Sequence, residues 1–393
     1  MASKSKRKKT TGQETAVQKD PPRADEERPS GPDAAKIVLG TLVVVLLLAL
    51  VGLFCAFRVR IREAEASERH AVASASDASV PLDALRAIPV INAHEHLFMR
   101  SHLDKYLSAC DRLGVVQTLF VGSPDFTLKG AGHSPKTGND ENNRVILDAA
   151  AEFPGKIVPF CTLHPDDEDK VQTLEAYVAE GGKGLKLYTG HGSFWDRPLD
   201  APEMLPVYEY CERTQLPICW HVNLLRYADE FSRVMLKFPR LIVIVPHFGV
   251  TFYRPTGSEW AVLQKLLDNY PGLYTDTSFG TRDILVAGLE VVSQYPDVFR
   301  AFFEKYQDRI FWGTDMVVTG NKEKTEEWVE AVLRACRDVL EKDTYHFFMA
   351  ARGSPYAAPG SPNIYGRLRG LALPDSILRK VYHENFERLF PAE

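Results

Sequence analysis

The sequence has few of the features that mark disulfide-rich, nucleic-acid-binding or dinucleotide-binding proteins. Its six cysteines form no Cys-x-x-Cys pair and are too sparse for a disulfide framework, so they do not report the redox compartment. The net charge of -5 argues against a nucleic-acid partner. No Gly-x-Gly-x-x-Gly turn follows the first strand-like run, as it would in a dinucleotide-binding sheet. With 45% hydrophobic and 25% charged residues, the 393-residue chain has the composition of one large globular domain with appendages.

The N-terminal 80 residues are predicted to lie outside that domain. Residues 1–36 are rich in charged residues and proline and are expected to be disordered. Residues 37–57 carry no charge and match the ~20 residues that a helix needs to cross a bilayer, so we predict a transmembrane helix that acts as a signal anchor. Lysines and an arginine near the N-terminus place the tail in the cytoplasm and the large domain on the non-cytoplasmic side. Residues 58–80 read as a polar linker, and the fold is expected from residue 81 to 393.

Short β-branched and aromatic runs then alternate with helical patterns, which is typical of repeated βα units around a parallel sheet. The eight predicted strands are Val90–His96, Val115–Gly122, Ile157–His164, Gly184–Tyr188, Pro217–Val222, Leu241–Phe248, Leu273–Ser278 and Ile310–Asp315. The helices predicted between them include Asn142–Phe153, Asp169–Glu180, Glu203–Arg213, Tyr227–Phe238, Glu259–Asn269 and Lys322–Glu341. The Gly- and Pro-rich stretch 352–374 is expected to lack regular structure.

Eight such units favour an α/β protein with the (β/α)8 TIM-barrel fold over a doubly wound open sheet, which usually has fewer strands. In a barrel of this kind the catalytic groups lie at the C-terminal ends of the strands. That rule directs attention to the polar residues with which these strands end.

The first strand ends in His94-Glu95-His96. Side chains two positions apart in a strand point to the same face about 6 to 7 Å apart, so both imidazoles can reach one metal ion. Glu95 between them faces the other way. His-x-His alone is weak evidence, because two hydrogen-bonded structural histidines would give the same pattern.

Other strand ends carry matching chemistry. His221 ends the fifth strand, His247 the sixth and Asp315 the eighth, and Lys186 lies within the fourth. We therefore expect these side chains to meet at one mouth of the barrel. Lys186 could equally pair with a carboxylate or line the cavity.

As a set, these residues resemble the amidohydrolase superfamily, in particular the amidohydrolase-related branch that includes aminocarboxymuconate-semialdehyde decarboxylase. The resemblance covers roughly residues 84–390 and includes the closing helix around Asn385. It implies that the metal ligands are His94, His96, His221 and Asp315, and that His247 hydrogen-bonds the substrate or the reacting water. The usual metal is zinc, with manganese and iron in relatives.

The resemblance leaves the number of metals open. With one metal, Asp315 would accept a proton from water whose pKa the metal lowers toward ~7. A second metal would require Lys186 to be carboxylated so that it bridges the two ions. We favour one metal, because relatives often keep an unmodified lysine at this strand.

Weaker candidates lie near the same mouth. His164 and His191 follow the third and fourth strands, and Trp195 is in the second of these loops; each could contact substrate. The next three loops contain arginines that could hold a substrate carboxylate, namely Arg226, Arg254 and Arg282. Together the arginines favour a small acidic substrate. Trp220 could line the pocket or pack in the core.

Three functions follow from this reading. The first is a membrane-anchored, metal-dependent hydrolase of a C–N or C–O bond. The second is a metal-dependent non-oxidative decarboxylase. The third is a catalytically silent barrel that serves as a binding module, for which we would expect a broken ligand set. The sequence leaves open whether the chain forms a homo-oligomer.

Overall fold

A computed structural model describes residues 88–130, 132–192, 194, 197–280, 282–348 and 364–391. The predicted tail, transmembrane helix and linker lie outside these residues, as does Trp195. In the part of the chain that is described, no helix combines the length and the apolar character needed to span a membrane.

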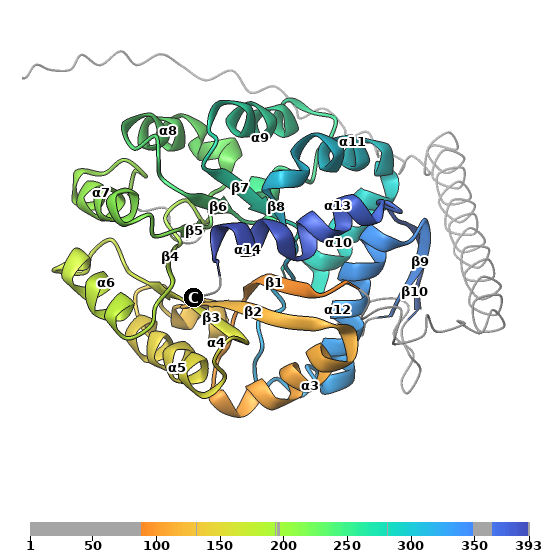
Figure 1. Ribbon diagram of the computed structural model, residues 1–393, viewed down its shortest axis with the longest axis horizontal. Helices are drawn as coiled ribbons and strands as arrows, with labels where there is room; N and C mark the ends of the chain where they lie inside the picture. The colour runs from red at the N-terminus through yellow and green to blue at the C-terminus, as the bar shows by residue number, and fades with distance from the viewer. Residues whose placement is uncertain are drawn as a thin grey trace, which may run out of the picture. The chain divides into compact units, whose positions relative to one another are not determined.

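The core of the fold is a parallel sheet of eight strands in sequence order (Figure 1). The strands are β1 (Val90–Glu95), β2 (Val115–Val121), β3 (Ile157–Thr162), β4 (Gly184–Leu187), β5 (Ile218–Trp220), β6 (Val243–Val245), β7 (Leu273–Asp276) and β8 (Ile310–Phe311). Backbone hydrogen bonds from Ala93 N to Trp312 O and from Asp315 N to His94 O join the last segment to the first. The predicted (β/α)8 barrel is thus confirmed.

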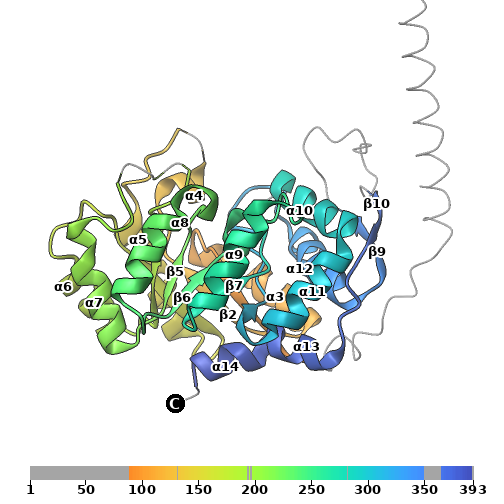
Figure 2. The same cartoon turned by 90° about the horizontal axis from the view of Figure 1, so that it is seen from above.

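Helices surround the strands (Figures 1 and 2). They are α3 (Leu103–Leu113), α4 (Asp125–Lys129), α5 (Asn139–Glu152), α6 (Lys170–Ala179), α7 (Leu205–Thr214), α8 (Leu224–Lys237), α9 (Ser258–Asn269), α10 (Arg282–Gln294), α11 (Pro296–Tyr306) and α12 (Glu326–Glu341). All six predicted helices are present. The last of them begins four residues later than predicted, because the Thr325 side chain accepts a hydrogen bond from Trp328 N and caps α12 there.

The prediction that 352–374 lacks regular structure is wrong for its second half. Strand β10 (Ile364–Arg369) pairs antiparallel with β9 (Thr344–Phe348), with Leu368 opposite Tyr345. Both of these side chains are buried. Pairing with a partner strand has overridden the local Gly and Pro signal.

The chain ends in α13 (Asp375–Arg379), a π-helical turn at Lys380–Glu384, and α14 (Asn385–Leu389). The ring of Phe386 packs on Phe311, and that of Phe390 packs on Phe160. Asn385 donates from Nδ2 to the carbonyls of Gln307 and Ile310 at the start of β8. These contacts close one end of the barrel (Figure 2), so the functional groups are confined to the opposite end.

Candidate metal centre and active site

The polar residues at the strand ends converge at the open mouth of the barrel. The ring centroid of His94 lies 5.3 Å from that of His96 and 5.1 Å from that of His247. The rings of His221 and His247 are 4.9 Å apart. Asp315 approaches His96 Nε2 with Oδ1 at 2.9 Å and His247 Nε2 with Oδ2 at 3.4 Å. The structure therefore brings together all five residues singled out at the ends of β1, β5, β6 and β8.

The contact between His96 and Asp315 joins two side chains that can both ligate a metal. Ser123 Oγ donates to Val121 O and lies 2.6 Å from His96 Nδ1, which favours the tautomer with the proton on Nδ1. In that tautomer the neutral ring directs the lone pair of Nε2 toward Asp315 Oδ1, 2.9 Å away. Two such atoms are held together either by a proton, as an imidazolium–carboxylate pair, or by a metal ion that both ligate. His94, His96 and Asp315 form a group whose ligand atoms lie within 4.8 Å of one another.

Burial favours the neutral imidazoles that bind a metal. It lowers the pKa of His94 to about 4, with Lys186 adding to the effect, and lowers the pKa of His96 and His221 as well. Burial alone would raise the pKa of Asp315. The nearby His94 and His96 lower it by more than burial raises it, so the pKa of Asp315 lies well below the usual range. At neutral pH the site therefore offers imidazole nitrogens and a carboxylate, which are good ligands for zinc, manganese or iron.

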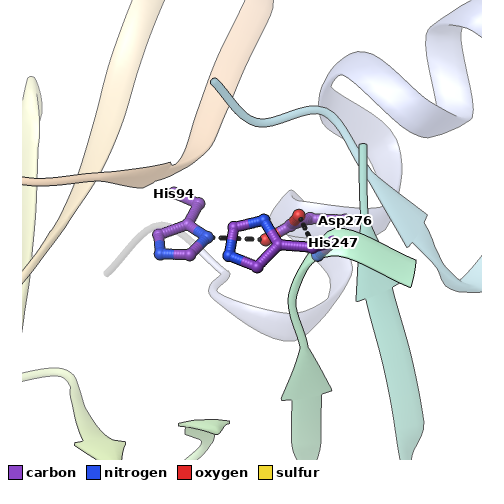
Figure 3. A group of neighbouring side chains, drawn as sticks. All are labelled: His94, His247 and Asp276. Carbon is purple, nitrogen blue, oxygen red and sulfur yellow. Dashed lines mark hydrogen bonds and ion pairs between the residues drawn. The ribbon is translucent and has the colours of Figure 1, made fainter. Parts of the chain in front are cut away.

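Asp276, at the end of β7, lies beside His94 and His247 (Figure 3). Its Oδ2 lies 3.0 Å from His94 Nδ1, and its Oδ1 accepts from the backbone N–H groups of His247 and Ser278. Burial raises the pKa of Asp276, but His94 and other neighbours bring it down to about 2. The carboxylate thus fixes the proton of His94 on Nδ1 and leaves Nε2 as the ligand atom.

The trio of His94, His247 and Asp276 is also compact enough to hold an ion. Both carboxylate oxygens of Asp276 are already occupied by hydrogen bonds, whereas Oδ1 of Asp315 is not. The first trio, with Asp315, is therefore the better metal centre. Sequence reasoning missed Asp276, because the seventh strand was predicted to run to Ser278, whereas β7 ends at Asp276.

Glu95, between the two histidines, holds the loop that carries Asp315. Its buried carboxylate accepts hydrogen bonds from Thr314 Oγ1 and from the backbone N–H groups of His96, Met316 and Val317. Asp315 and Val317 have left-handed backbone conformations, with φ of 51° and 55°, which side chains other than glycine rarely adopt. The Glu95 contacts fix this unusual turn, and with it the position of Asp315.

Lys186 is fully buried in β4. Its Nζ lies 3.1 Å from His94 Nε2 and 3.5 Å from Cys219 Sγ. The lysine thus reaches the proposed metal centre, as its position in the sequence suggested. A carboxylated Lys186 that bridges two metals stays the less favoured alternative.

A pocket of about 320 Å³ opens above these groups. His96, His221, His247 and Asp315 form its polar floor, and His191 lies in its wall, with its ring 4.3 Å from that of His221. The roles of His221 as a ligand and of His191 as a substrate contact remain predictions.

Other candidates lie elsewhere. His164 lines a smaller neighbouring cavity, where its Nδ1 accepts from Asp166 N. Arg226 and Arg254 are exposed, the first stacked over Tyr227 and the second beside Glu259. The Arg282 side chain is outside the described part of the structure. Trp220 is a core residue whose indole donates to Thr189 O. Neither Arg226 nor Arg254 is among the described residues that line the pocket.

Comparison with known proteins identifies the family. The sequence model of the amidohydrolase family matches residues 112–392. The chain belongs to the amidohydrolase family. A search of curated proteins finds no match. The match begins after β1, so the His94 and His96 pair supports membership independently.

Solved structures share the amidohydrolase barrel at low sequence identity. A putative 2-pyrone-4,6-dicarboxylic acid hydrolase from Pseudomonas putida has a TM-score of 0.53 and 17% identity over 78% of this chain and 99% of its own. A probable enzyme of the same description from Acinetobacter baumannii has a TM-score of 0.51 and 14% identity over 78% and 100%. A zinc-bound amidohydrolase from Burkholderia multivorans has a TM-score of 0.52 and 11% identity over 78% and 100%. These similarities show the fold.

Proposed function

We propose that this amidohydrolase is a metal-dependent hydrolase that cleaves a C–N or C–O bond of a small molecule. The observation that carries the proposal is the cluster of His94, His96 and Asp315, whose ligand atoms lie within 4.8 Å of one another, with His96 Nε2 and Asp315 Oδ1 2.9 Å apart. His94, His96 and Asp315 would hold the metal, with His221 as a further ligand. When bound, a divalent ion supplies Lewis acidity and lowers the pKa of a coordinated water.

The chain's own groups provide the proton path. Asp315 is ionised and its Oδ2 lies at the pocket floor, where it can accept a proton from the attacking water. His247 lies 3.4 Å from this oxygen through Nε2. Its Nδ1 lies 3.0 Å from the carbonyl of Ser278 and donates there, so Nε2 carries a lone pair that can share the proton. The proton then passes to the nitrogen or oxygen atom that leaves the substrate.

This path favours hydrolysis over decarboxylation. Hydrolysis moves a proton from water to the leaving group, and the pair of Asp315 and His247 is placed for that transfer. In the decarboxylase alternative an arginine would hold the substrate carboxylate beside the metal, and no lysine or arginine is among the described residues that line the pocket. All four predicted metal ligands, His94, His96, His221 and Asp315, are present in the sequence, which argues against a catalytically silent barrel.

The test uses the full-length chain loaded with zinc or manganese. We expect hydrolysis of at least one compound in a panel of esters, lactones and amides, strongly reduced in Asp315→Asn and retained in Asp297→Asn. Asp297 is 83% exposed and pairs only locally with Arg300, so it controls for loss of a carboxylate. Release of carbon dioxide from aromatic or unsaturated acids, without hydrolysis of any panel member, would replace the proposal with the decarboxylase. Metal binding without either reaction would favour the binding module.

We also propose that residues 37–57 anchor the enzyme in a bilayer, with the barrel on the non-cytoplasmic side. The support is the uncharged run itself and the basic residues before it. The full chain should stay in the membrane pellet at alkaline pH, and a Val45→Arg, Leu48→Arg variant should be released. Equal extraction of both chains would reject the anchor, and protease digestion of intact spheroplasts tests the sidedness.

A further inference from the structure

We propose that the pocket selects a substrate with an uncharged, apolar group next to the bond that is cleaved. This inference rests on the proposed function and adds the substrate class. It departs from the acidic substrate that the arginines in the sequence favoured.

One side of the pocket is apolar. Its wall contains Val250 and Phe252 from the loop after β6, Phe279 and Ile284 from the region after β7, and Val317 from the loop after β8. The rings of Phe252 and Phe279 are nearly fully buried and lie 5.1 Å apart, edge to face. They are fixed members of the same lining as the polar groups of the floor. A ligand in this space would meet polar groups at one end and apolar groups along its length.

The apolar surface continues to the rim. Among the described residues, seven large hydrophobic side chains are exposed, and two of them, Tyr253 and Ile284, line this pocket with 46% and 47% of their surface accessible. Exposed apolar side chains grouped at a concave site are typical of surfaces that a ligand covers. Each methylene group that leaves water here should tighten binding about fourfold.

Charge argues in the same direction. The described lining residues include no lysine or arginine to offset the charge of a substrate carboxylate. Arg254, which follows β6, is 77% exposed and lies beside Glu259. A carboxylate placed along the wall would lose its hydration without gaining a cationic partner.

The experiment compares two small amides with equal numbers of non-hydrogen atoms, hexanamide and succinamate, by saturation-transfer NMR on the metal-loaded full chain. We expect hexanamide to bind at least about tenfold more tightly. Ile284→Asp should abolish that preference, and Leu236→Asp should keep it, because Leu236 is 71% exposed and is not part of the pocket lining. Melting temperatures check that both variants fold.

Tighter binding of succinamate, equal binding of the two amides, or binding of neither would overturn the inference. The measurement needs no turnover, so it is separable from the test of function. A preference for hexanamide in a protein that hydrolyses nothing would contradict the proposed function alone. Hydrolysis confined to substrates that carry a carboxylate would contradict the inference alone.

Discussion

The floor and the wall of the pocket are built in different ways. The floor consists of buried polar groups at strand ends, and most of their atoms are fixed by hydrogen bonds, as between His94 and Asp276 or His96 and Ser123. The wall consists of apolar side chains from loops, and part of it is open to solvent, as at Tyr253 and Ile284. We therefore expect the reaction chemistry to depend on the floor and the substrate choice on the wall. Changes to the floor should alter metal binding and rate, and changes to the wall should alter affinity for substrate.

The largest effect should come from Asp315, the floor residue to which we assign both metal binding and proton transfer. Asp315→Asn keeps the shape of the side chain but removes the charge and the basic oxygen. We expect kcat/KM to fall by about 10³-fold or more, measured with the best substrate from the panel. A loss below tenfold would show that Asp315 has neither role.

A smaller effect should come from Glu95, which touches no substrate. In Glu95→Gln one oxygen becomes an NH2 group that faces donors such as Met316 N or Val317 N. The Asp315 turn should loosen, and metal affinity should fall about 10- to 100-fold. Competition with a chelating dye measures this affinity. Glu141→Gln, on the exposed side of α5, is the control. Equal metal affinity in the two variants would show that Glu95 does not position the metal ligands.

The smallest effect should come from His191, at the boundary between floor and wall. Burial, followed by Lys186, lowers its pKa from 6.5 to about 4. Between these values the unfolded chain binds a proton that the folded chain does not, so stability should fall as the pH falls from 6.5 to 4. One such histidine changes the free energy of unfolding by at most about 1.4 kcal/mol per pH unit.

Urea unfolding of the metal-free protein across this range should therefore show a flatter pH dependence in His191→Gln than in the natural chain. A steeper dependence in the variant would mean that His191 is protonated in the folded state. The control is His133→Gln, since His133 is exposed.

The sequence was sufficient to predict the barrel and most of the floor. The run from Leu241 to Pro246 is uninterrupted and apolar and is followed by His247, and such runs repeat often enough to be counted. The same rule places His221 and Asp315 at the mouth. The role of Glu95 could not be predicted, because its partners Met316 and Val317 are more than 200 residues away in the chain.

The wall was not predictable for a different reason. The four residues His247 to Val250 all have positive φ, between 51° and 63°. This left-handed turn starts the loop that brings Val250 and Phe252 into the wall. Gly249 is the one glycine in this turn and its only signal in the sequence. A side chain there would clash, because an added Cβ would lie 2.3 Å from Leu224 Cδ1. Arg226 and Arg254 follow strands, as expected of clamp residues, but their side chains are exposed.

The most direct test of the central claim is the metal content per chain of the purified full-length protein, measured by plasma mass spectrometry after incubation with zinc or manganese. We expect about one equivalent of metal in the natural chain and in Asp297→Asn, and almost none in His96→Ala and Asp315→Asn. Two equivalents would bring a carboxylated Lys186 into the site. Equal metal content in all four proteins, or none in the natural chain, would contradict a metal held between His96 and Asp315.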